Sequence, residues 1–259
     1  MNNVLHARTS GQGPDIVLLH GLFGQGSNLG SVSRALMSDF RVHCLDLPDH
    51  GRSSWLTEAS LVSYAAAVRE WMQSNALPSA HVLGHSLGGK VAMELALTTP
   101  ERVGKLIVAD IAPVTYTEQH LQILEALQQV VDRRCETRAE AEAVLCEVIE
   151  DPGVVGYLLM NLERADGACR WRFNLTGLTD AYGRLRQAPS EAAPFQGPAL
   201  FLQGGNSAYI QAAHEHEIRR RFPDSQLATV QDAGHWLHVD QPDQFNGAVR
   251  TFLLAEGTR

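Results

Sequence analysis

The chain has 259 residues, of which 44% are hydrophobic and 19% are charged, and its formal net charge is −8 at pH 7. This composition excludes a disordered chain, a collagen-like repeat and a coiled coil. The acidic balance argues against a nucleic-acid partner, which requires a basic surface. No apolar run approaches the roughly 20 residues that cross a bilayer, so we expect no membrane span.

The first six residues do not show a basic start followed by an apolar run, so they do not resemble a secretory signal. We therefore expect a cytoplasmic protein. The four cysteines show no CxxC spacing, which favours reduced thiols.

Short apolar strands alternate with helices along much of the chain. Strands are expected at residues 16–19, 41–46, 81–83, 106–109, 199–202 and 227–230, and helices at 31–37, 61–73, 87–98, 208–221 and 242–254. This alternation predicts an α/β fold, with a mostly parallel central sheet and helices on both faces. Ligands of such sheets lie beyond the carboxyl ends of the strands.

A helical insertion interrupts this pattern. Leu121, Leu124, Leu127 and Val131 recur at spacings of three and four, as on one face of a helix. Further helices are expected at residues 139–149, 154–162 and 178–185, and no strand is expected from 117 to about 187. We therefore expect a core formed by residues 1–113 and 190–259, and a helical lid formed by residues 114–189.

The strongest local motif is at residues 84–89 (GHSLGG), directly after a strand and before a helix. Its G-x-S-x-G pattern in this context is typical of a nucleophile elbow. Gly84 and Gly88 allow the two backbones to approach closely, and the turn raises the Ser86 hydroxyl above the sheet edge. The N–H of Leu87, at the helix N-terminus, then faces a developing oxyanion.

Two other glycine-rich interpretations are weaker. Residues 84–90 also match most of a Walker A loop, but Val91 stands where a Ser or Thr would hold magnesium. Residues 24–30 contain three glycines after a strand, yet their spacing departs from the dinucleotide fingerprint. A His-Gly turn at residues 20–24 fits better as the second half of an oxyanion hole, with the Leu22 N–H as donor.

The general base and the acid of the predicted triad are chosen by their positions relative to the expected strands. A serine needs a base, and His235 comes just past the last strand and before the last helix, at the same edge as Ser86. The loop after residues 199–202 carries no Asp or Glu, whereas Asp110 ends an earlier strand. Asp110 is therefore the predicted triad acid. Asp232, three residues before His235, is expected to brace its loop.

Other polar groups are expected to have structural roles. Residues 46–53 (DLPDHGRS) predict a turn without direct chemistry. His214, His216 and His238 are interpreted as surface or packing residues. The pair His214-x-His216 has metal-ligand character but no evident third ligand.

These motifs occur in order over most of the chain, which resembles the alpha/beta-hydrolase fold superfamily and, more closely, the small YbfF-type bacterial esterases. The resemblance rests on residues 20–24, 46–53, 84–90, 109–113, 204–209 and 233–235. It implies hydrolysis of esters, with acyl-CoA thioesters as a further class, and no metal or organic cofactor. In that subgroup the acid comes from the earlier strand, in agreement with Asp110.

The sequence thus predicts a serine esterase acting on a small-molecule ester or thioester. The lid is expected to cover Ser86 and to contribute to an acyl pocket. The candidates for lining that pocket are Phe23, Leu159, Met160, Trp171 and Phe173. Carbon–carbon bond hydrolysis, a lactonase, a cofactor-free perhydrolase and a non-catalytic ligand-binding protein remain alternatives, because fold alone does not fix function.

Overall fold

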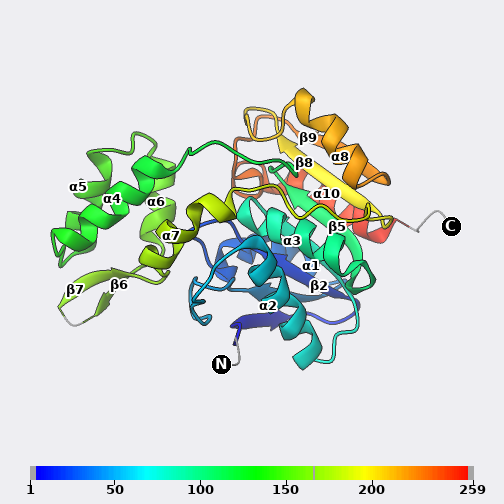
Figure 1. Ribbon diagram of the computed structural model, residues 1–259, viewed down its shortest axis with the longest axis horizontal. Helices are drawn as coiled ribbons and strands as arrows, with labels where there is room; N and C mark the ends of the chain where they lie inside the picture. Colours follow the sequence, from blue (N-terminus) through cyan, green and yellow to red (C-terminus); the bar gives the residue numbers. More distant parts are fainter. Residues whose placement is uncertain (1–3, 166, 256–259) are drawn as a thin grey trace.

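A seven-stranded sheet forms the centre of the computed structural model, which describes residues 4–165 and 167–255 (Figure 1). In sheet order its strands are β1 (Ala7–Ser10), β3 (Arg41–Leu45), β2 (Asp15–Leu19), β4 (Ala80–His85), β5 (Val103–Ala109), β8 (Ala199–Gly204) and β9 (Ser225–Val230). All neighbouring pairs are parallel except β1 with β3. The predicted mostly parallel sheet is confirmed, with β1 as an additional edge strand.

Helices cover both faces of the sheet. The core helices are α1 (Gly30–Leu36), α2 (Leu61–Ser74), α3 (Leu87–Thr98), α8 (Glu215–Arg221), α9 (Leu237–Asp240) and α10 (Pro242–Leu254), with 3₁₀ turns at Gly26–Leu29, Pro100–Arg102 and Ala212–His214. Along β2, Val17 and Leu19 pack in the cluster that contains α2 and α3. Ile16 and Leu18 pack with α1 and α10 on the other face. This alternation follows from the two-residue period of a strand.

Between β5 and β8 the chain forms a separate layer, at the left of Figure 1. It consists of α4 (Leu121–Asp132), α5 (Arg138–Cys146), α6 (Pro152–Leu159), β6 (Leu162–Ala165), β7 (Ala168–Trp171) and α7 (Leu175–Leu185). Because this layer lies wholly between two neighbouring core strands, we retain residues 114–189 as the proposed lid. The outer ends of the proposed core, residues 1–3 and 256–259, lie outside the described residues.

Two sequence expectations were wrong. The lid contains an antiparallel hairpin, β6–β7, where no strand was expected. Both strands carry charged side chains and are only four residues long, so neither shows an apolar run. The helix expected from residue 208 begins only at Glu215, after a loop and a 3₁₀ turn.

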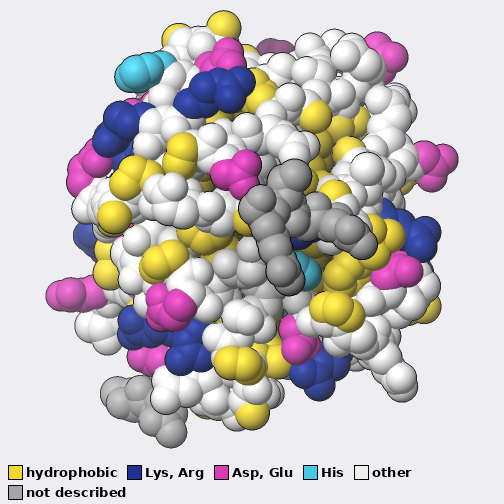
Figure 2. Space-filling model, turned by 90° about the vertical axis from the view of Figure 1, so that its right-hand side faces the viewer, with side chains coloured by type: hydrophobic (Ala, Val, Ile, Leu, Met, Phe, Trp, Pro, Cys, Tyr) yellow, Lys and Arg dark blue, Asp and Glu magenta, His cyan; other side chains and the backbone are white. Residues whose placement is uncertain are grey.

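Figure 2 shows the face on the right-hand side of Figure 1. On this face, acidic and basic side chains lie interspersed among apolar ones. Among the described residues, no helix is both long and apolar enough to cross a membrane.

A buried lysine joins the two ends of the lid to the core. Lys90 on α3 donates from Nζ to the carbonyls of Val114 (2.8 Å), Arg186 (2.9 Å) and Gln187. Burial lowers the pKa of Lys90 to about 7. The three carbonyls match the three N–H donors of its ammonium form.

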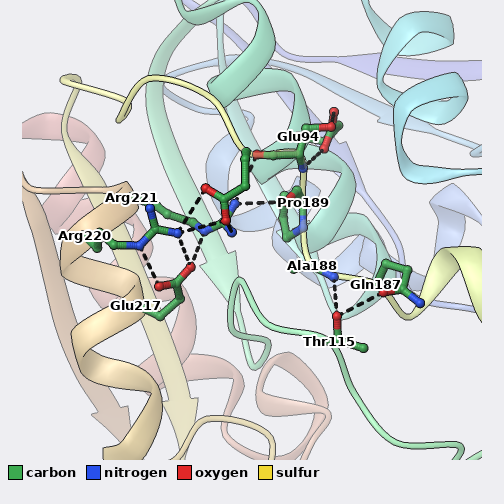
Figure 3. A network of polar contacts seen from close by, with 10 residues as sticks. Glu94, Thr115, Gln187, Ala188, Pro189, Glu217, Arg220 and Arg221 are labelled. Carbon is green, nitrogen blue, oxygen red and sulfur yellow. Dashed lines mark hydrogen bonds and ion pairs between the residues drawn. The ribbon is translucent and has the colours of Figure 1, made fainter.

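The segment that returns from the lid to the core is held by further polar contacts (Figure 3). Glu94 on α3 accepts hydrogen bonds from the backbone N–H (2.7 Å) and the hydroxyl (2.8 Å) of Ser190. Arg221 on α8 donates to the Pro189 carbonyl at 2.9 Å. The Thr115 hydroxyl accepts from the Ala188 N–H at 3.0 Å and so links the two connections of the lid.

We predict that Lys90→Met lowers the free energy of unfolding by about 2 kcal/mol or more, because it removes the hydrogen bonds of a buried side chain to three partly buried carbonyls. It should also speed limited proteolysis at the two lid connections. Lys105→Met is a matched control, since Lys105 also donates to three carbonyls, but at the end of α10. Equal cleavage rates at the lid connections in both variants would contradict the role given to Lys90.

Candidate active site

Ser86 lies at a sharp turn between β4 and α3. Its backbone has φ 53° and ψ −117°, a strained conformation for a residue with a side chain. The turn is possible because glycines flank it: a Cβ on Gly84 would lie 2.1 Å from the Gly88 carbonyl oxygen, and one on Gly88 would lie 2.2 Å from the Leu19 carbonyl oxygen. The strand–turn–helix context expected for a nucleophile elbow is therefore present.

Asp110 and His235 meet at the same edge of the sheet. The Nδ1–H of His235 donates to Asp110 Oδ2 at 2.8 Å, although the residues are 125 positions apart. Asp110 follows β5 and is fully buried, whereas the His235 side chain is 21% exposed. The Asp110 carboxylate also accepts from the Gly204 N–H at 3.0 Å and from the Ser207 hydroxyl. The hydrogen bond with Ser207 holds the loop after β8 at the sheet edge.

Aromatic side chains fix the orientation of the His235 ring. Tyr209 stacks on it with ring centroids 3.9 Å apart and an interplanar angle of 19°. The His85 ring lies 4.7 Å away, and its Nε2–H donates to the His235 carbonyl at 2.8 Å. Since His85 is the neighbour of Ser86, this bond connects the turn at Ser86 directly to the loop of His235.

The turn at residues 20–24 lies against Ser86: a Cβ on Gly21 would lie 3.4 Å from the Ser86 Cβ. His50 supports this turn, because its Nε2 accepts from the Phe23 N–H at 3.2 Å. From the lid, the Tyr157 hydroxyl donates to the Leu22 carbonyl at 3.0 Å. The turn is thus held both by the core and by α6.

Leu22, Ser86 and Leu87 line one small cavity of about 50 Å³. In the part of the chain that the structure describes, the N–H groups of Leu22 and Leu87 donate to no protein acceptor. An oxyanion hole requires unpaired backbone donors beside the serine, and these two residues offer them.

A larger cavity of about 570 Å³ opens on Ser86 and His235. Lid residues on one side of it include Ile123, Val154 and Tyr157. A cavity of this size is within the range of small-molecule sites.

The predicted acyl pocket requires correction. Of the five candidates only Phe23 lines the cavity that contains Ser86. Leu159 is buried in the core of the lid, and Met160 is 49% exposed at the surface. Trp171 and Phe173 are buried and stack on each other, with centroids 5.4 Å apart. Apolar character alone did not distinguish packing residues from lining residues.

Sequence reasoning did not assign any role to several residues of the site. Tyr157, Tyr209, His120 and Trp236 line the larger cavity, and Ser207 contacts Asp110. Tyr209 and Ser207 belong to the motif at residues 204–209, and this motif could have indicated their role in the site. Tyr157 and His120 belong to the lid, whose placement over the sheet edge has no local signature.

Asp232 does not brace the His235 loop through its side chain. It is exposed, and its carboxylate accepts no hydrogen bond within residues 4–165 and 167–255. Asp240 takes this role instead, because its Oδ2 accepts from the Gly234 N–H at 2.8 Å. His238, expected to be a packing or surface residue, is buried against the His85 ring.

Buried neutral histidines surround the site. Burial lowers the pKa of His20 to about 4 and that of His50 to about 3. It also lowers the pKa of His120 and His238 to about 4. His20 donates from Nδ1 to the Gly21 carbonyl and accepts at Nε2 from Leu47, so it needs to be neutral.

The family is established by comparison with known proteins. A model of the alpha/beta hydrolase family matches residues 16–248. The chain therefore belongs to the alpha/beta hydrolase family, and its fold is the alpha/beta-hydrolase fold.

Its relatives place it among hydrolases of the esterase and lipase type. It is 38% identical over 248 residues to the sn-1-specific diacylglycerol lipase ABHD11 of Mus musculus, covering 93% of this chain and 81% of the relative. It is 34% identical over 240 residues to the esterase YbfF of Escherichia coli, covering 92% of both chains. A solved marine microorganism esterase superposes with a TM-score of 0.93 at 36% identity, covering 96% of this chain and 99% of that one.

We predict that the protein loses stability as the pH falls from 6.5 toward 4. The four histidines with lowered pKa values bind protons in the unfolded chain from about pH 6.5 but in the folded protein only near pH 4 or below. At pH 5 each costs about 2 kcal/mol, and the sum is comparable with a typical total stability. Urea unfolding at pH 7 and pH 5 measures this, and equal midpoints would contradict it.

Proposed function

We propose that this protein is a serine carboxylesterase in which Ser86 is the nucleophile, His235 the general base and Asp110 the acid that orients it. The hydrogen bond of 2.8 Å between His235 and the buried Asp110, at the cavity that Ser86 lines, is the main support for this proposal. The carboxylate fixes the tautomer with a proton on Nδ1, which leaves Nε2 free to accept the serine proton.

In the first half of the reaction, Ser86 Oγ attacks the acyl carbonyl while His235 takes its proton. The negative charge that develops on the carbonyl oxygen is stabilised by the N–H groups of Leu22 and Leu87. Loss of one such donor costs about 3 kcal/mol of transition-state stabilisation in serine proteases. His235 then protonates the leaving alcohol or thiol, and the acyl group remains on Ser86.

In the second half, water attacks the acyl-enzyme with His235 again as base, and the acid is released. Stacking of Tyr209 on the His235 ring supports this cycle, because it keeps the ring in one plane while its charge changes.

We propose short- to medium-chain acyl esters as substrates, with acyl-CoA thioesters as a second class. The cavity volume and its apolar walls, among them Phe23, Ile123 and Val154, support an acyl chain of moderate length. Apolar walls discriminate chain length by only about 1–3 kcal/mol per methylene, so a graded preference is expected. A panel of p-nitrophenyl esters and acyl-CoA thioesters over a range of acyl lengths separates the two classes.

We predict that Ser86→Ala abolishes ester turnover and labelling by a fluorophosphonate while the protein stays folded. The change removes the attacking oxygen, and Ala at this turn retains a Cβ. Turnover of a short p-nitrophenyl ester and the circular dichroism spectrum measure the two effects. Ester turnover at the wild-type rate in the folded variant would refute the mechanism.

We predict that Asp110→Asn lowers kcat/KM by about 10³-fold or more, because an amide does not fix the required His tautomer. Asp232→Asn removes the same charge from an exposed position nearby and should cost much less. The comparison uses the same ester at pH 7, with thermal unfolding to show that both variants are folded. The reverse order of effects would move the acid to Asp232.

A further inference from the structure

A second cavity, of about 620 Å³, lies outside the proposed active site. It shares no lining residue with the cavity at Ser86. A row of three aromatic rings lies between the two: Phe23 lines the Ser86 cavity and packs on Phe173 at 5.2 Å between ring centroids, and Phe173 stacks on Trp171, which lines the second cavity. We call this second cavity the basic cleft.

Arginine side chains from three segments line the basic cleft. Arg8 comes from β1, Arg52 from the loop after β3, and Arg170 and Arg172 from the lid, in and just after β7. This gathering of positive charge stands out in a chain whose net charge is −8.

The two carboxylates in the lining are already partnered. Glu163 bridges Arg170 (2.6 Å) and Arg172 (3.0 Å), which hold the pKa of its carboxyl below the ordinary value. Asp46 is buried and accepts from the N–H groups of Gly26 (2.7 Å) and Arg52 (2.9 Å). Neither carboxylate is paired with the guanidinium group of Arg8 or Arg52.

Two guanidinium groups therefore remain available to a ligand. In the described part of the chain, Arg8 and Arg52 form no side-chain hydrogen bond and no ion pair. A guanidinium group matches the geometry of a phosphate oxygen pair and binds it through two parallel hydrogen bonds. With Arg8, Arg52 and the Glu163-bridged pair in one cavity, four arginines face two carboxylates, which leaves an excess of positive charge.

An exposed tryptophan lines the same cavity. The Trp55 residue is 60% exposed, although covering an indole ring is favourable by a few kcal/mol. A flat aromatic ring of a ligand covers such a side chain by stacking. Any nucleobase can do so, because every base has an aromatic face.

We propose that the basic cleft binds a nucleoside phosphate, with its phosphates on Arg8 and Arg52 and its base on Trp55. The cleft volume is within the range of small-molecule sites. Arginines alone fit any phosphate, and Trp55 is the feature that favours a nucleoside phosphate over inorganic phosphate. This site is independent of ester hydrolysis.

Calorimetric titration with ADP, pyrophosphate and adenosine tests the proposal. The Ser86→Ala protein is used, so that the result does not depend on turnover. We expect saturable ADP binding with a Kd below about 1 mM, at least tenfold tighter than that of pyrophosphate or adenosine. No saturable binding of ADP, or pyrophosphate binding as tight as that of ADP, would overturn the proposal.

Variants of the cleft assign the two halves of the ligand. The double change Arg8→Gln and Arg52→Gln should weaken both ADP and pyrophosphate binding at least tenfold. Trp55→Ala should weaken ADP binding to the level of pyrophosphate and leave pyrophosphate unchanged. Arg133→Gln is a control for loss of one arginine outside the cleft, because Arg133 is paired with Glu147 in the lid and does not line the cleft. ADP binding that is unaffected by the changes at Arg8, Arg52 and Trp55 would place the ligand elsewhere.

Discussion

One buried carboxylate organises the edge of the sheet. Asp110 has no exposed surface, and a charge in that position is tolerated only when its oxygens are fully hydrogen-bonded. Its three partners are Gly204 at the end of β8, Ser207 in the loop after β8, and His235 in the loop after β9. The ends of β5, β8 and β9 are thereby joined at a single point. The proposed hydrolysis depends on that connection, because it determines where the His235 ring lies.

The lid contacts the turn at residues 20–24, which is part of the proposed oxyanion hole. Tyr157 reaches from α6 to the carbonyl of Leu22, and burial raises the pKa of its hydroxyl, so it remains a donor. The same ring packs against Trp236, next to His235, at 5.4 Å between centroids. One lid side chain thus contacts both the turn at residues 20–24 and the loop of His235. Placement of the lid and the geometry of the proposed oxyanion hole are coupled through it.

The sequence predicted the features that depend on local patterns. Buried parallel strands appear as apolar runs, and the turn at Ser86 requires glycine at positions 84 and 88, so both leave a direct signal. Asp110 is predicted as the acid by elimination, because the loop after β8 offers no carboxylate. The edge strand β1 and the hairpin β6–β7 were missed, since partly exposed strands of four residues carry no apolar run.

The lining of the cavity was less predictable, for a physical reason. A large apolar side chain lowers its free energy equally by filling the lid core or by facing a ligand cavity, so Leu159, Trp171 and Phe173 carry no local mark of which they do. Only the path of the lid decides, and it depends on long-range contacts such as that of Asn174 with Asp49, where Nδ2 donates to the carboxylate at 2.9 Å. Trp171 and Phe173, two of the residues wrongly assigned to the acyl pocket, instead lie between the Ser86 cavity and the basic cleft. Trp171 lines the basic cleft, and Phe173 separates it from Phe23, a core residue that lines the Ser86 cavity.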